Sequence, residues 1–143
     1  MNEVVVGHDR EPRKVTKEEF ELRKNPADLL DEWQKRLFLD GWYIKLEVNV
    51  QPEDMFLEGC AGCTRSGEVT EVAIIQIIDP HRYEGIISFD FEVTLVHELL
   101  HLKLGLLDDD PESEKESLAY RLLHRYIDEL ARALVDAQRS GAN

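Results

Sequence analysis

His97, Glu98 and His101 form an HExxH sequence, the most chemically informative spacing in this chain of 143 residues. The motif falls inside a segment predicted to be helical, where residues four positions apart lie on one face about 6 Å apart. That spacing lets two imidazole nitrogens bind one tetrahedral zinc ion at about 2 Å each. Glu98, next to the first histidine, can reach a zinc-bound water as a general base without binding the metal itself. We therefore predict a zinc site with His97 and His101 as ligands and Glu98 as the catalytic base.

A catalytic zinc ion also needs a third protein ligand and an open position for water. The best candidate is Glu116, which a helical wheel places with Leu123 and Ile127 on the buried side of the last helix. Its alternative role is that of the acidic residue in a capping box. Glu112 also faces inward, although an acid in a first helical turn interacts favourably with the helix dipole in any case. Asp108, in the loop after the HExxH helix, is the remaining candidate for the third ligand.

Composition and charge restrict the class of protein. Lys and Arg total 17 and Asp and Glu total 30, which gives a formal net charge of −13 and argues against binding to nucleic acid. The sequence has no apolar run of the roughly 18 residues that a membrane span requires, and its N-terminus does not resemble a secretory signal. We expect a cytoplasmic, soluble protein with one domain over residues 1–143, of which the first fifteen or so are expected to be flexible.

Hydrophobic periodicity and capping signals predict an α+β fold, in which a small antiparallel or mixed sheet packs on the HExxH helix and a long C-terminal helix. Strands are expected at residues 43–50, where apolar and polar residues alternate, and at the β-branched run 72–78. Helices are expected over 16–24, 26–39 and 91–104, and from just after Pro111 to about Gln138. The apolar stripe of the last helix is predicted to comprise Leu122, Leu123, Tyr126, Ile127, Leu130 and Leu134.

The two cysteines of the chain, Cys60 and Cys63, are arranged as Cys-Ala-Gly-Cys. Two cysteines are too few for a disulfide framework in a chain of this length, which agrees with a reducing compartment. No second Cys-x-x-Cys is present to complete a zinc site. Because glycines surround the pair, we interpret it as a turn or hairpin rather than as a metal or redox site.

The order of these motifs resembles the gluzincin class of zinc metallopeptidases, in which HExxH is followed by a glutamate ligand on a later helix. It is more narrowly similar to compact intracellular members of the ImmA/IrrE type, found in phages and mobile elements. Those proteins carry a glutamate followed three residues later by alanine, as Glu116 and Ala119 are here. The similarity extends over about residues 42–134. It implies a minimal zincin-like domain that binds Zn²⁺ through His97, His101 and Glu116.

The resemblance also implies a mechanism and a substrate. Glu98 would deprotonate the zinc-bound water for attack on a peptide carbonyl and pass the proton to the leaving amine. Tyr120, one turn beyond Glu116, is expected to donate a hydrogen bond to the oxyanion, with His124 behind it. An extended protein or peptide substrate is expected to pair with the edge of strand 72–78.

Two other functions are consistent with the same residues. The first is a zincin-like module that binds a protein partner without catalysis. The second is a metal-dependent ribonuclease similar to YbeY, whose motif the run from Thr94 to Leu106 resembles. That family has three histidines and a glycine in place of Glu98, and an acidic chain is a poor binder of RNA.

Overall fold

The computed structural model describes residues 2–7, 25–67, 69–105 and 118–141. Within these ranges the chain is α+β, as expected, with a four-stranded mixed sheet and three α-helices. The elements are β1 (Glu3–Val6), α2 (Pro26–Arg36), β2 (Tyr43–Val50), β3 (Gly62–Ser66), β4 (Val72–Ile78), α3 (Phe91–Leu104) and α4 (Leu118–Ser140).

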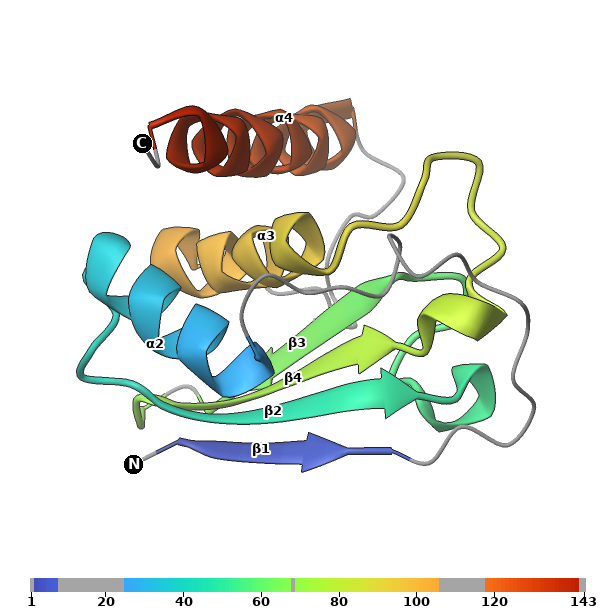
Figure 1. Cartoon of the computed structure of the whole chain (residues 1–143), viewed down its shortest axis with the longest axis horizontal. Coiled ribbons are helices and arrows are strands. Elements are labelled where there is room, and N and C mark those ends of the chain that lie inside the picture. The colour runs from blue at the N-terminus through green and yellow to red at the C-terminus, as the bar shows by residue number, and fades with distance from the viewer. Residues whose placement is uncertain (1, 8–24, 68, 106–117, 142–143) are drawn as a thin grey trace.

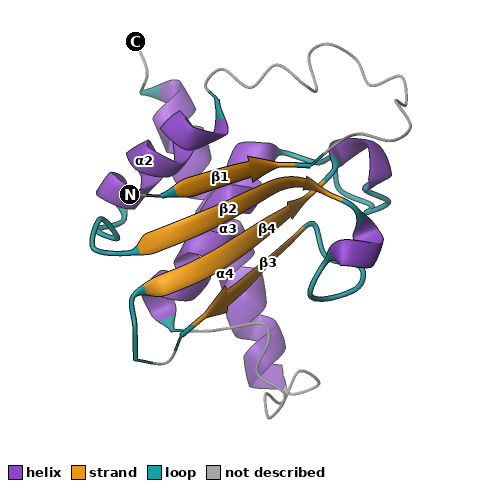
Figure 2. Cartoon of the chain, turned by 90° about the horizontal axis from the view of Figure 1, so that it is seen from below, coloured by secondary structure: helices purple, strands orange, loops and turns teal. Residues whose placement is uncertain are grey.

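The molecule is built in layers (Figure 1). The strand order is β1-β2-β4-β3, in which β1, β2 and β4 run parallel and β3 runs antiparallel to β4. Seen from below, the sheet lies in front of the helices, so all three cover the same face (Figure 2). Because α4 lies on the side of α3 that faces away from the sheet, α3 forms the middle layer (Figure 1).

The two strands expected from the sequence are both present. Alternation along β2 buries Ile44, Leu46 and Val48 against the helices, whereas the residues between them face outward. The continuous apolar run of β4 suits a central strand, because β4 pairs with β2 on one side and with β3 on the other. The expectation that a peptide adds to strand 72–78 is therefore wrong, since this strand has no free edge. Among the described strands, β1 and β3 form the edges of the sheet.

Two strands were not expected. Residues 3–6, inside the N-terminal segment expected to be flexible, form β1 and pair in parallel with β2. The glycine-rich segment interpreted as a turn or hairpin contains β3, which forms an antiparallel hairpin with β4, with Cys63 opposite Gln76. Both strands are short, and neither alternates clearly between apolar and polar residues. Pairing with a partner strand therefore determines their conformation, more than their own sequence does.

The predicted helix caps are largely confirmed. Asn25 Oδ1 accepts a hydrogen bond of 2.9 Å from the backbone N–H of Asp28 at the start of α2. Asp90 Oδ1 does the same for Val93 at 3.1 Å, and Gly105 ends α3 with a φ of 69°. Helix α2 ends at Arg36 rather than at residue 39, where the predicted helix ended. The helix predicted over 16–24 and the start of the last helix lie outside the described residues.

The buried face of α4 differs from the predicted stripe. Ile127, Ala131 and Val135 are buried. In contrast, Leu123, Tyr126 and Leu130, which belong to the predicted stripe, are exposed. The predicted stripe includes the buried Ile127 but not Ala131 or Val135, which are also buried. No helix among the described residues is both long and apolar enough to cross a lipid bilayer.

The middle position of α3 allows a direct test of the fold. Leu99 is 0% exposed and Leu104, on the same helix, is 52% exposed. We expect Leu99→Ala to lower the free energy of unfolding by about 2–5 kcal/mol, because it removes packed methyl groups and leaves a cavity. Leu104→Ala should change it by no more than about 0.5 kcal/mol. Urea unfolding followed by tryptophan fluorescence measures both, and equal effects would contradict the layer arrangement.

Candidate metal centre

Three histidines meet between α3 and α4. His97 and His101 on α3 and His124 on α4 each place a ring nitrogen within 4.8 Å of the other two. The ring centroids are 5.0 Å apart for His97 and His101, 5.2 Å for His97 and His124, and 4.8 Å for His101 and His124. Nitrogens bound to one tetrahedral zinc ion lie about 3.4 Å apart. Small rotations of the rings would therefore bring all three onto a single ion.

The position of each histidine follows from helix geometry. His97 and His101, one turn apart on α3, lie side by side as predicted. His124 lies three residues before Ile127, on the side of α4 that faces α3. Within the described residues, these three side chains form a group close enough to hold a metal ion. The predicted third ligand Glu116 and its alternatives Glu112 and Asp108 lie outside the described residues.

Asp128 orients the ring of His97. Its Oδ1 lies 3.4 Å from His97 Nδ1, and its Oδ2 accepts a hydrogen bond of 3.0 Å from Arg132 Nε. The other ring nitrogen, His97 Nε2, lies 3.9 Å from Glu98 Oε2. A carboxylate that accepts a hydrogen bond from one ring N–H keeps the proton on that nitrogen, so the other nitrogen is unprotonated and can bind a metal.

Burial keeps His97 neutral. Loss of contact with water, together with the neighbouring His101 and His124, lowers the pKa of His97 from 6.5 to about 4, although Asp128 acts in the opposite direction. A histidine must be unprotonated to bind a metal ion. The ring of His97 is therefore in its ligand form at neutral pH without any metal present.

Glu98 is held against the sheet by β3. Glu98 is 2% exposed, and its Oε1 accepts a hydrogen bond of 2.8 Å from Thr64 Oγ1. Gly62 allows β3 to come this close, because a Cβ at this position would lie 2.9 Å from Thr94 Cγ2 and 3.0 Å from Glu98 Cγ. The second carboxylate oxygen faces His97. The predicted base is thus a buried, oriented carboxylate next to the histidine cluster.

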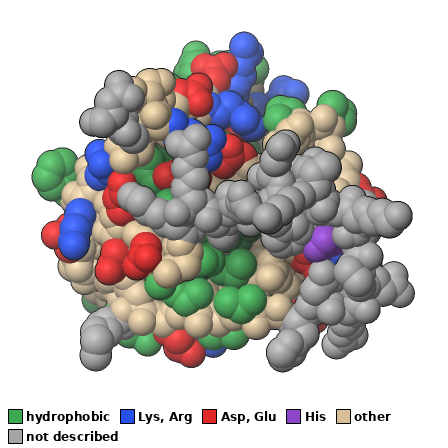
Figure 3. All heavy atoms as spheres, viewed as in Figure 1, with side chains coloured by type: hydrophobic (Ala, Val, Ile, Leu, Met, Phe, Trp, Pro, Cys, Tyr) green, Lys and Arg blue, Asp and Glu red, His purple; other side chains and the backbone are tan. Residues whose placement is uncertain are grey.

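A cavity of about 250 Å³ opens beside this group. His97, Glu98 and His124 form part of its wall, and Arg132 is the cation among its described lining residues. At the surface, histidine atoms are visible next to acidic side chains (Figure 3). The remaining lining residues are Cys60, Ala61, Gly62, Tyr83, Ile87, Ser88, Phe89, Asp90, Val93, Thr94 and Asp128. The cavity therefore combines an apolar wall with a polar end at the histidines, as ligand sites commonly do.

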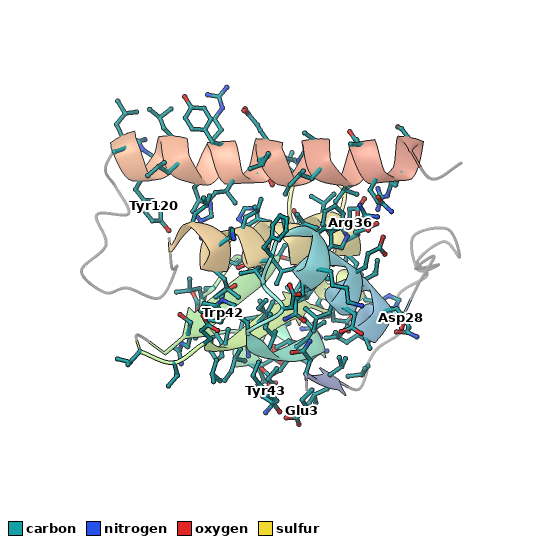
Figure 4. All side chains as sticks on the ribbon, turned by 90° about the vertical axis from the view of Figure 1, so that its left-hand side faces the viewer. Glu3, Asp28, Arg36, Trp42, Tyr43 and Tyr120 are labelled. Atoms are coloured by element: carbon teal, nitrogen blue, oxygen red, sulfur yellow. The ribbon has the colours of Figure 1, made fainter. Side chains whose placement is uncertain are left out.

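Tyr120, the predicted oxyanion donor, lies next to His124. It projects from α4 towards the layer of α3 (Figure 4), and its ring centroid is 5.4 Å from that of His124. The described lining of the cavity includes His124 but not Tyr120. The structure thus brings together the predicted neighbours on α4, and it places His124 closer to the cavity than Tyr120.

His124 was considered in the sequence only as a residue behind Tyr120, and not as a ligand. The signal that could have found it is its spacing from Asp128 and Arg132, which follow it at intervals of four residues on one helix face.

Comparison with known proteins does not identify a family: no protein-family model matches the chain, and no curated protein or solved structure matches it significantly. A functional proposal therefore depends on the chemistry of this site.

The environment of His97 predicts an unusual titration. In metal-free protein, NMR should show the His97 ring neutral down to about pH 4, whereas in urea it should titrate near 6.5. Because the folded pKa is the lower one, the unfolded chain binds the proton more tightly. This histidine should therefore make the protein less stable as the pH falls from about 6.5 towards 4. A His97 pKa near 6.5 in the folded protein would contradict the buried cluster.

Proposed function

We propose that this protein is a zinc-dependent metallopeptidase that hydrolyses peptide bonds of a protein substrate. The observation that carries the proposal is the meeting of three histidine nitrogens within 4.8 Å, with the buried carboxylate of Glu98 beside them. Two of these histidines and the glutamate are the HExxH residues. The same proposal places the enzyme in the cytoplasm, where cysteines are mostly reduced and disulfides form transiently.

In this proposal the zinc ligands are His97, His101 and His124. Three nitrogen donors suit zinc, and they leave the fourth tetrahedral position open to water and substrate. A histidine as third ligand differs from the glutamate of the gluzincin pattern. It is supported by the position of His124, whose ring centroid is 4.8 Å from that of His101.

Glu98 would act as the general base. Its Oε2, 3.9 Å from His97 Nε2, faces the histidine cluster, while the hydrogen bond from Thr64 fixes Oε1. From there the carboxylate can accept a proton from the attacking water and deliver it to the leaving amine. Zinc, when bound, would supply Lewis acidity towards the carbonyl and make the water more acidic.

Arg132 and Tyr120 are the candidates for stabilising the oxyanion. Arg132 lines the cavity and donates its Nε–H to Asp128. In this proposal its terminal N–H groups donate to the oxyanion. Tyr120 lies against the ring of His124. We favour Arg132, because a charged donor on the cavity wall stabilises developing negative charge more strongly than a neutral one.

The substrate would bind along β3. Among the described strands β3 is an edge of the sheet, and it carries both Gly62 and Thr64 next to the proposed base. An extended peptide that adds to such an edge is held by backbone hydrogen bonds, largely independently of its sequence. This arrangement would present a peptide carbonyl to the metal and to Glu98 together.

The zinc content of single variants distinguishes the candidates for the third zinc ligand. Purified without added metal, the protein should contain one zinc ion, and His124→Ala should weaken zinc binding by more than about 100-fold, the upper range for residues that only support a ligand. Glu116→Ala and Asp108→Ala should retain zinc. Metal analysis and competition with a chelator measure this, and circular dichroism confirms folding. Zinc that survives His124→Ala but is lost with Glu116→Ala would show that the glutamate is the ligand.

Replacement of the base tests catalysis separately from binding. Glu98→Gln should retain zinc and lower the hydrolysis of a library of fluorogenic peptides by at least about 100-fold, because the amide cannot accept the proton. Glu129→Gln is the matched control, since Glu129 lies on the exposed face of α4 in an ion pair with Arg125. It should keep the wild-type rate. Equal rates for Glu98→Gln and wild type would overturn the assigned base.

The alternative functions give different results in the same assays. A non-catalytic module would bind zinc but cleave no peptide of the library, with or without Glu98→Gln. A metal-dependent ribonuclease would cleave single-stranded RNA in place of peptides. Either result would replace the proposed function while leaving the metal site intact.

A further inference from the structure

Cys60 and Cys63 lie where the sheet meets the candidate metal centre. Cys60 is half-buried and lines the cavity that contains His97 and Glu98. Cys63 belongs to β3 and is 1% exposed. Both are thiols rather than a disulfide. The metal site does not use them, because the group of side chains that can hold an ion within the described residues consists of histidines.

The two thiols contact each other. A hydrogen bond with Cys60, together with burial, raises the pKa of the Cys63 thiol. Each sulfur also lies near a carbonyl of the preceding turn: Cys60 Sγ is 3.8 Å from Glu58 O and Cys63 Sγ is 4.0 Å from Leu57 O. The two thiols are therefore neighbours, as the formation of a disulfide requires.

The segment that carries the thiols is packed directly on the proposed base. Gly62 has no room for even a Cβ against Thr94 and Glu98, and Thr64 donates a hydrogen bond to Glu98. The backbone of Cys63 is fixed in the ladder opposite Gln76, whereas Cys60 precedes the strand. Bringing the two sulfurs to bonding distance must therefore move Cys60 and Ala61, which directly precede Gly62 and its close approach to Glu98.

We propose that Cys60 and Cys63 form a reversible disulfide that controls the position of Glu98. With glutathione disulfide as oxidant, the Cys60 thiolate attacks one sulfur of the disulfide, forms a mixed disulfide and releases one glutathione thiolate. The Cys63 thiol then passes its proton to the released glutathione thiolate, and its sulfur attacks the Cys60 sulfur and displaces the second glutathione as a thiolate, which takes up the proton that Cys60 had lost. The two protein thiols lose two electrons and two protons, and one glutathione disulfide becomes two glutathione molecules. Glutathione reverses both steps.

The accessibility of the two sulfurs determines the order of these steps. Cys60 is on the cavity wall and meets the oxidant first, whereas Cys63 is 1% exposed and reacts only with Cys60. The zinc ligands lie on α3 and α4, so oxidation should alter the base without removing the metal. Only the activity measurement below depends on the proposed function.

The test uses the full chain in glutathione buffers of increasing oxidised fraction. Intact-mass spectrometry should show the loss of two hydrogen atoms, and peptide mapping should place the bond between Cys60 and Cys63. In metal-free protein the NMR amide signals of Thr64 and Glu98 should shift, while that of Val135 on α4 should not. Peptide hydrolysis should fall about tenfold at unchanged zinc content, the size of effect seen when support of an active group is lost, and should return with reductant.

Single variants separate the roles of the two thiols. Cys63→Ala should stop at the mixed disulfide and gain one glutathione, because the resolving thiol is absent. Cys60→Ser should gain nothing, since the remaining thiol is buried, and its hydrolysis rate should be the same with and without oxidant. A wild-type protein that stops at the mixed disulfide would overturn the inference. So would a disulfide that forms without shifting the signals of Thr64 and Glu98. If no peptide is cleaved even when reduced, the proposed function fails while mass and NMR still decide this inference.

Discussion

The packing of α4 on α3 is the contact on which the candidate metal centre depends. Two imidazoles come from α3 and one from α4, so neither helix forms the cluster alone. Small and β-branched residues of α4, including the buried Ala131, let the helices approach closely. At the other end of the contact, Arg139 of α4 pairs with Asp90 at 2.7 Å and with Glu92 at 3.3 Å, next to the start of α3. These contacts limit how far α4 can slide along α3, and therefore whether His124 meets the HExxH histidines.

Local signals in the sequence predicted the elements that are defined locally. Period-two alternation located the strand over 43–50, and the acceptor side chains of Asn25 and Asp90 located the starts of two helices. The short strands β1 and β3 were missed, because their structure comes from hydrogen bonds to strands distant in the sequence. The expected free edge at strand 72–78 is a different error, because its continuous apolar run is typical of an interior strand.

The sequence predicted the part of the candidate site that lies on a single helix, α3. The spacing of HExxH placed His97 and His101 together and put Glu98 beside them. The third histidine of the cluster comes from another helix, so whether it meets the first two depends on which face of α4 packs inward. That face contains Ile127, Ala131 and Val135, whereas Leu123, expected inward from the sequence, is 45% exposed. The packing of α4 on α3 is a long-range contact that the spacing within α3 does not predict. Glu116, the third ligand predicted from the sequence, lies outside the described residues.

The five residues of β3 connect three features that the sequence presents separately. The strand holds the proposed base through Thr64, approaches α3 through the missing side chain of Gly62, and carries the buried thiol of Cys63. On the proposed function, the same strand pairs with the peptide. A peptide that pairs with β3 and a disulfide that displaces it then act on one backbone. Such coupling is reciprocal: if the disulfide weakens peptide binding, bound peptide must disfavour the disulfide by the same free energy. Substrate would thereby protect the reduced form of the site that it uses.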